Sequence, residues 1–129
     1  MNKLTVVAAL LLTAGLVFAG GSAETETAGD ASLQYVLDKG ELVLGLDDSF
    51  PPMVFRDDGG EIVGFDIDLA REVADRLGVE LRLQPIDWDA KILDLNSKDI
   101  DVIWNGLTIT AEREEKIDFS KPYIANRQI

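Results

Sequence analysis

The stretch GFDIDLAREVADRLGVELRLQP, residues Gly64–Pro85, changes its hydrophobic period partway along and thereby decides the fold class. Its first part repeats apolar residues at helical spacing, which predicts an amphipathic helix from a cap at Asp66 to Leu77. Gly78 follows at the position where helices commonly end. Segment 79–84 then alternates apolar and polar residues, which predicts a half-buried strand.

The residues before this stretch predict a short helix, a buried strand and a hairpin. ELVLGL, residues Glu41–Leu46, is a short apolar run that ends at acidic residues and is typical of a buried strand. Segments 53–55 and 62–63 flank Asp-Asp-Gly-Gly, which indicates a hairpin. Further back, Ser32 is expected to cap a short helix over 33–39.

The residues after it continue the alternation of helices and strands. We expect a helix from Asp89 to about Asn96, a strand over 101–104, a helical turn over 111–116 and an extended segment at 126–129. Strands that alternate with helices predict an α/β lobe with a mainly parallel sheet flanked by helices. In such sheets ligands bind outside the carboxyl ends of the strands, here the loops 47–52, 85–88 and 105–110.

Composition excludes several classes of function. Residues 24–129 carry 11 Lys and Arg against 24 Asp and Glu, a net charge of −13, which argues against nucleic acid and anionic membranes as partners. The sequence holds no Cys and no His, so disulfides, thiolate sites and the commonest general base are excluded. Any metal would need carboxylates only, and no cofactor is predicted.

The N-terminus has the features of a secretory signal. Lys3 precedes an apolar stretch of about 14 residues over 4–17, and small residues follow at Ala19, Gly21 and Ala23. We predict a signal peptide over 1–23 with cleavage after any of these three; the alternative is an uncleaved membrane anchor. No Cys follows, so a lipid anchor on cysteine is excluded. Segment 24–31 is small, polar and acidic and is predicted to be a disordered tether.

One segment carries a family resemblance. DVIWNGLTITAEREEKIDFSKPY, residues Asp101–Tyr123, resembles the ligand-carboxylate site of the periplasmic solute-binding proteins of amino-acid ABC importers, the bacterial extracellular solute-binding proteins of family 3. The resemblance extends over residues 33–129. It implies a type II periplasmic-binding-protein fold, with most of lobe 1 over 32–125, the start of a hinge strand at 126–129 and the second lobe absent.

The resemblance implies a carboxylate-binding role for Arg113. An Arg guanidinium is a planar fork that pairs bidentately with a carboxylate, although by itself Arg113 in AEREEK would be a solvated surface residue. Thr108 would add a hydroxyl and a backbone N–H, and Gly106 would let the backbone approach and accept from an ammonium. Asn105 occupies a family position that often carries a small hydroxyl residue. Thr110 is expected to cap the following turn.

The resemblance also implies walls for the ligand side chain. Phe50 and Trp88 would sandwich it, and Asp47 would offer a carboxylate to its distal end. Packing in the lobe is the alternative for both aromatics, and a solvated turn is the alternative for Asp47. Trp104 is expected to pack against the lobe. Asp66 is interpreted as a helix cap, outside the site.

The function implied is that of the extracytoplasmic or periplasmic binding component of an amino-acid ABC importer. It would bind a free L-amino acid with a polar side chain in a cleft between two lobes and deliver it to membrane permease subunits. A sensor domain of a membrane receptor is one alternative, and an enzyme resembling the cyclohexadienyl dehydratases is another. A single lobe is expected to bind weakly or not at all, because it covers only one side of the ligand.

Overall fold

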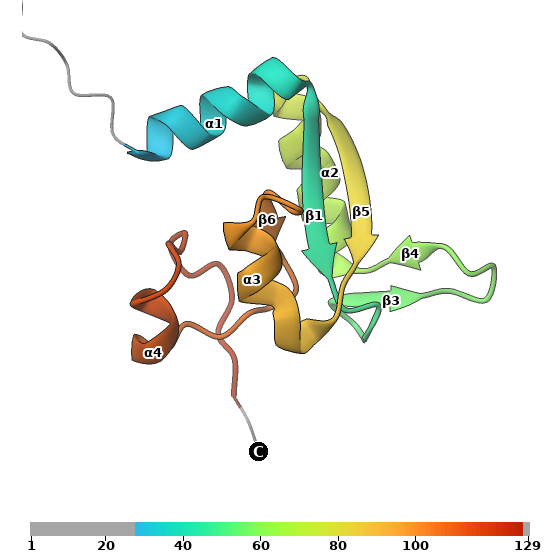
Figure 1. Cartoon of the computed structure of the whole chain (residues 1–129). Helices are drawn as coiled ribbons and strands as arrows, with labels where there is room; N and C mark the ends of the chain where they lie inside the picture. Colours follow the sequence, from blue (N-terminus) through green and yellow to red (C-terminus); the bar gives the residue numbers. More distant parts are fainter. Residues whose placement is uncertain (1–27, 128–129) are drawn as a thin grey trace, which may run out of the picture.

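The computed structural model describes residues 28–127, shown in Figure 1. Helices and short strands alternate along the chain, in the order α1 (Ala28–Lys39), β1 (Glu41–Leu46), β2 (Ser49–Phe50), β3 (Val54–Arg56), β4 (Ile62–Val63), α2 (Phe65–Leu77), β5 (Glu80–Pro85), a 3-10 turn (Trp88–Ala90), α3 (Lys91–Asn96), β6 (Val102–Ile103) and α4 (Ala111–Glu114).

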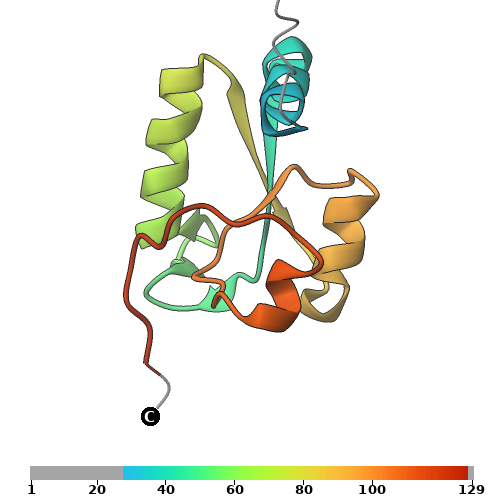
Figure 2. The same ribbon diagram turned by 90° about the vertical axis from the view of Figure 1, so that its left-hand side faces the viewer.

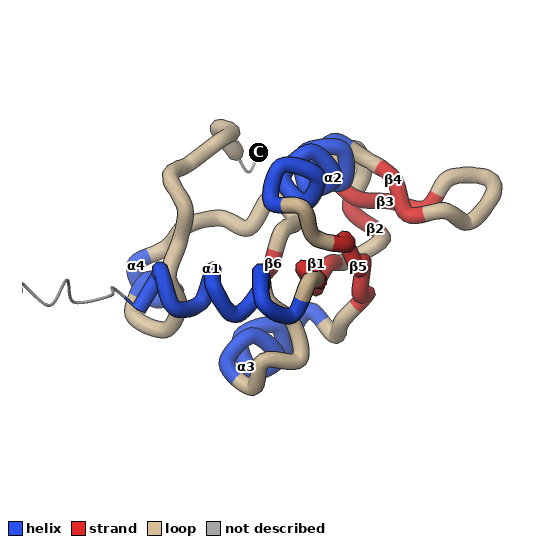
Figure 3. The backbone as a smooth tube through the Cα atoms, turned by 90° about the horizontal axis from the view of Figure 1, so that it is seen from above, coloured by secondary structure: helices blue, strands red, loops and turns tan. Residues whose placement is uncertain are grey.

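The main sheet has three parallel strands in the order β5–β1–β6. The central strand β1 is almost wholly buried, and it pairs Leu44 with Leu83 of β5 and with Val102 of β6. Figure 3 shows α2 and α3 on opposite faces of this sheet, so each connection between parallel strands passes over one face. The predicted α/β lobe with a mainly parallel sheet is confirmed.

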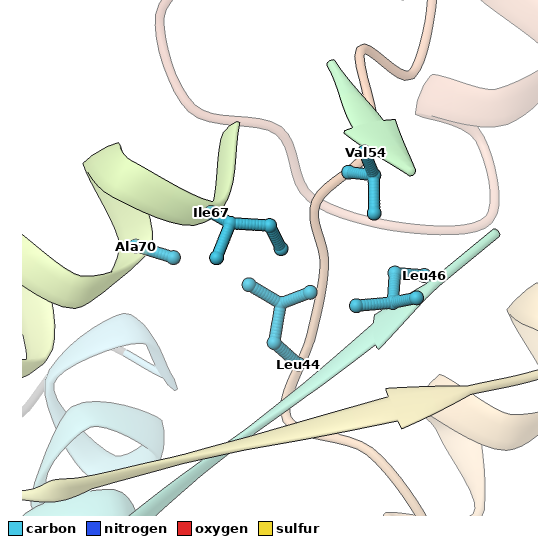
Figure 4. Close-up of a cluster of buried hydrophobic side chains, with 5 residues drawn as sticks. All are labelled: Leu44, Leu46, Val54, Ile67 and Ala70. Carbon is cyan, nitrogen blue, oxygen red and sulfur yellow. The ribbon is translucent and has the colours of Figure 1, made fainter. Parts of the chain in front are cut away.

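The hydrophobic core lies between β1, α2 and the start of the hairpin. Leu44, Leu46, Val54, Ile67 and Ala70 form one cluster with no exposed surface, seen in Figure 4. Burying one Leu or Ile side chain contributes about 1.5–3 kcal/mol, so this small cluster supplies much of the stability of the lobe.

Close packing behind β1 requires a glycine. A Cβ atom added at Gly45 would clash with Ile100 Cδ1, and Ile100 is itself buried at 1% exposure. A second contact ties the same region to α1, because Asp101 Oδ2 accepts from Lys39 Nζ at 2.6 Å and from the Val43 backbone N–H at 2.7 Å. The packing of Ile100 against Gly45 and the hydrogen bonds of Asp101 therefore hold β6 against β1.

A second sheet consists of the antiparallel strands β2, β3 and β4. The predicted hairpin is confirmed, and Asp57 Oδ1 closes its turn by accepting from the backbone N–H groups of Gly59 and Glu61. β2 was not predicted, because two residues carry no periodic signal. It matters for the site, since pairing with β3 fixes the backbone of Phe50.

Three expected helix starts were wrong. α1 begins at Ala28, four residues before the expected cap at Ser32, so segment 28–31 of the expected tether is helical; alanine is the strongest helix former and favours this extension. α2 begins after Gly64, and Asp66 is a buried residue of its first turn instead of its cap. Asp87, not Asp89, caps the 3-10 turn, because its side chain accepts from Asp89 N.

The predicted signal peptide over 1–23, its cleavage position and residues 24–27 of the tether lie outside the described residues. So do 128–129, and the described part of the expected hinge strand, 126–127, forms no strand. Within 28–127, no helix is long and apolar enough to cross a membrane.

Candidate functional site

The loops that follow β1, β5 and β6 lie together at the carboxyl end of the sheet, with α4 beside them in Figure 2. They enclose a cleft of about 530 Å³. All seven residues singled out from the sequence line this cleft, together with Leu107, Thr110 and Asn126: Asp47, Phe50, Trp88, Asn105, Gly106, Thr108 and Arg113. The loops that meet at this cleft are those at the carboxyl ends of the parallel strands, where such sheets commonly place ligands.

Arg113 is half-buried and is the third residue of the short helix α4. The predicted cap is confirmed, because Thr110 Oγ1 accepts from the Arg113 backbone N–H at 3.3 Å. The Arg113 side chain turns back along the chain, and its Nη1 donates to the Thr108 carbonyl at 2.7 Å. A guanidinium carries five N–H donors in a fixed fork, so holding one of them orients the whole group.

Gly106 and Thr108 form the wall of the cleft next to Arg113. Gly106 has φ 62°, a left-handed conformation that costs a residue with a side chain about 1–2 kcal/mol. Thr108 Oγ1 accepts from Asn126 Nδ2 at 3.0 Å. Asn126 was missed by the sequence reasoning, because a single amide near the end of the chain gives no pattern.

Asn105 and Asp47 connect the first and third loops. Asn105 is buried at 4% exposure, and its Oδ1 accepts from the Asp47 backbone N–H at 3.3 Å. Asp47 Oδ1 in turn accepts from the Ser49 backbone N–H at 3.0 Å and from Ser49 Oγ at 2.6 Å. Asp47 therefore closes a turn and lines the cleft at once, and Asn105 braces the two loops.

Phe50 and Trp88 contribute aromatic surface from two different loops. Phe50 is 44% exposed, although it lies in a strand. Lys91 Nζ lies 4.9 Å from the centroid of the Trp88 ring and donates to the Trp88 carbonyl at 2.7 Å. This cation–π contact fixes the indole at the edge of the cleft.

Next to the cleft, Asp66, Tyr123 and Trp104 form a small group of interacting side chains. Asp66 is fully buried, and Tyr123 Oη donates to its Oδ1 at 2.8 Å. Burial raises the pKa of Asp66, and the donors Tyr123, Gly106 N–H and Trp104 oppose that rise. Burial and the Asp66 carboxylate raise the pKa of Tyr123 to about 12. Trp104 packs against the core as expected and meets the Tyr123 ring edge-on at 6.2 Å.

A second hollow of about 450 Å³ lies on the other side of the Gly106–Thr108 segment, between the residues after β6 and those after α4. Its lining is mostly apolar and shares Asn105, Gly106, Thr108 and Asn126 with the cleft. The segment that lines the cleft is therefore a thin wall between two hollows.

The sheet order, the two flanking helices and a cleft beyond the strand ends define one lobe of a type II periplasmic binding protein. The chain belongs to the bacterial extracellular solute-binding proteins, family 3, whose profile matches residues 42–129. Both the family and the fold expected from the sequence are thus confirmed.

Individual relatives agree with this assignment. The chain is 38% identical over 115 residues to the L-cystine-binding protein TcyJ of Escherichia coli, which covers 89% of this chain and 43% of TcyJ. The arginine-bound form of domain 1 of TmArgBP from T. maritima is 49% identical, with a TM-score of 0.67 over 69% of this chain and 71% of that one. An ancestral cyclohexadienyl dehydratase is 37% identical, with a TM-score of 0.69 over 71% of this chain and 38% of its own. The chain therefore spans less than half the length of TcyJ.

Proposed function

We propose that this chain is the solute-binding part of an amino-acid ABC importer and that it holds the α-carboxylate of a free L-amino acid. The observation that carries the proposal is the convergence of Arg113, Thr108 and Gly106 on one cleft. The guanidinium fork supplies paired donors and the threonine adds a hydroxyl. Arg113 is held by its bond to the Thr108 carbonyl, and the Thr108 hydroxyl is held by Asn126.

The ligand side chain is proposed to be polar, with basic and glutamine-like side chains ahead of aliphatic ones. Phe50 and Trp88 offer flat surfaces for an extended or planar group, and the Asp47 carboxylate lies in the same cleft. The relatives point the same way, since one is named for cystine and one is arginine-bound. A cationic ligand would also be attracted by the strongly acidic chain.

A binding role explains these groups better than catalysis does. Arg113 and Thr108 are donors suited to a stable anion, and Asp47, the carboxylate of the cleft, already accepts two hydrogen bonds in its own turn. The dehydratase among the structural neighbours keeps an enzyme as the second candidate. A receptor sensor domain uses the same binding chemistry and differs only in what the lobe is attached to.

The full site is proposed to lie between two lobes, with a periplasmic location and a membrane permease as partner. One earlier expectation changes, however. A single lobe was expected to bind weakly, yet domain 1 of TmArgBP is arginine-bound by itself. We therefore propose that the lobe described here holds the greater part of the contacts to the ligand.

Calorimetric titration of the protein with the twenty L-amino acids and L-cystine tests the proposal. Saturable binding of L-arginine, L-glutamine or L-cystine is expected. A preference for Leu, Ile and Val would refute the polar assignment, and no binding to any amino acid would refute the function. Turnover of a cyclohexadienyl acid would decide for the enzyme.

A further inference from the structure

The carboxylate of Asp66, next to the cleft, is buried with few hydrogen-bond donors. Asp66 has no exposed surface, and only its Oδ1 accepts a hydrogen bond of full geometry, from Tyr123. Asp66 Oδ2 and Trp104 Nε1 are buried and have no such partner within the part of the chain that the structure describes. Burial raises the pKa of this carboxyl group, and the Gly106 N–H and the Trp104 indole lower it more weakly than Tyr123 does.

Stability alone does not account for this arrangement. A buried charge without full pairing is costly, and apolar side chains of similar volume often stabilise a protein as well or better. Ile67 and Ala70, which follow Asp66 on the same helix, show that this region is otherwise apolar core. A buried polar group with an unmet oxygen calls for a further explanation.

The groups around Asp66 lead to the ligand cleft by two short routes. The first is through space, because Gly106, which lines the cleft, lies close enough to Asp66 for its backbone N–H to lower the pKa of that carboxyl group. The second runs through Tyr123 to Asn126, three residues on, whose Nδ2 donates to Thr108 Oγ1. Both connections end at the Gly106–Thr108 segment, the wall that lines the cleft.

This wall depends on such anchors. The Gly106–Thr108 segment has a hollow of about 530 Å³ on one side and one of about 450 Å³ on the other. Packing supports the segment beside Gly106, where Phe50 and Met53 are the nearest side chains, and the hydrogen bonds of Thr108 supply further support. Arg113 is tied to the same segment through the Thr108 carbonyl, so a shift of the wall would also turn the guanidinium.

We propose that Asp66 is the positioning residue of the ligand-carboxylate site. Through its hydrogen bond with Tyr123 it fixes the segment that carries Asn126, which donates to Thr108, and so keeps Thr108 and Arg113 in one fixed arrangement facing the ligand. The inference deepens the proposed function and rests on it. Asp66 itself does not line the cleft.

Asp66→Asn tests the inference, because it keeps the size of the side chain and an oxygen for Tyr123 but removes the charge and one acceptor. L-arginine is the first probe, with L-glutamine and L-cystine as the second and third, titrated by calorimetry into the protein. We expect affinity to fall at least about tenfold, or ~1.4 kcal/mol, while thermal unfolding stays cooperative. Asp68→Asn is the matched control: its side chain lies on the same helical turn at 79% exposure, and its affinity should be unchanged.

A double-mutant cycle separates positioning from general stabilisation. If Asp66 acts through the wall, Asp66→Asn combined with Thr108→Ala should lose less affinity than the sum of the two single losses. Simple additivity would show that Asp66 acts elsewhere.

If Asp66→Asn does not fold, Tyr123→Phe decides, since it removes one hydroxyl and should weaken binding at least about threefold. Wild-type affinity in either folded variant would overturn the inference. If the wild-type protein binds none of the probes, it is the proposed function that fails.

Discussion

Replacing Arg113 with Ala should remove a large part of the free energy of amino-acid binding. Truncating one partner of a buried, hydrogen-bonded charge pair costs about 2–5 kcal/mol. Arg113 is half-buried beside an open cleft, so solvent screening favours the lower end of that range. We expect a loss of about 2–3 kcal/mol, which is about 30- to 160-fold in Kd.

Calorimetry on Arg113→Ala measures this loss directly, and the matched control is Lys116→Ala. Lys116 lies three residues on and pairs with Glu112 at 2.7 Å, so removing it changes the local charge equally without touching the cleft. Arg113→Lys should also bind poorly, because an ammonium cannot reproduce the fork. Near-wild-type affinity in Arg113→Ala, or an equal loss in Lys116→Ala, would refute the carboxylate assignment.

Four further predictions concern the surroundings of the site. Gly106→Ala should cost about 1–2 kcal/mol of unfolding free energy, measured in urea, because φ is 62° there; an unchanged midpoint would contradict it. Asp101→Ala should cost about 1–3 kcal/mol by leaving the Val43 N–H unpaired, and chemical denaturation checks this. Trp88→Phe, but not Trp104→Phe, should abolish most of the fluorescence change on binding. Because burial raises the pKa of Asp66 above its ordinary value of 3.8, the stability that the protonated group contributes is lost as pH rises from there through the raised pKa, so Asp66→Asn should gain stability relative to wild type as pH rises above 3.8; the opposite trend would refute the pKa direction.

The architecture could be predicted from the sequence because its periodic segments are long enough to carry a signal. The helix Phe65–Leu77 and the strand Glu80–Pro85 follow their hydrophobic patterns closely. Helix starts were less accurate. Asp66 has the residue type of a cap but is buried by the later segment that brings Tyr123 against it, and no local pattern reports a contact 57 residues away.

The candidate site could be located because loops at strand ends are where an α/β sheet places its ligands. What the sequence could not supply is how each group is held. Asn105 is a buried brace, Asp47 is engaged in a turn, and Lys91 covers the Trp88 ring. The Asn105 contact joins segments 58 residues apart, whose mutual position only the folded chain determines. The other two contacts are local, but no periodic pattern reports them.

A crystal structure of the protein with L-arginine bound tests the central claim most directly. We predict that the ligand lies in the cleft between Phe50 and Trp88, with its α-carboxylate within hydrogen-bond distance of the Arg113 guanidinium and of Thr108. A ligand whose carboxylate faces away from Arg113, or that occupies the hollow on the far side of Gly106, would contradict the account.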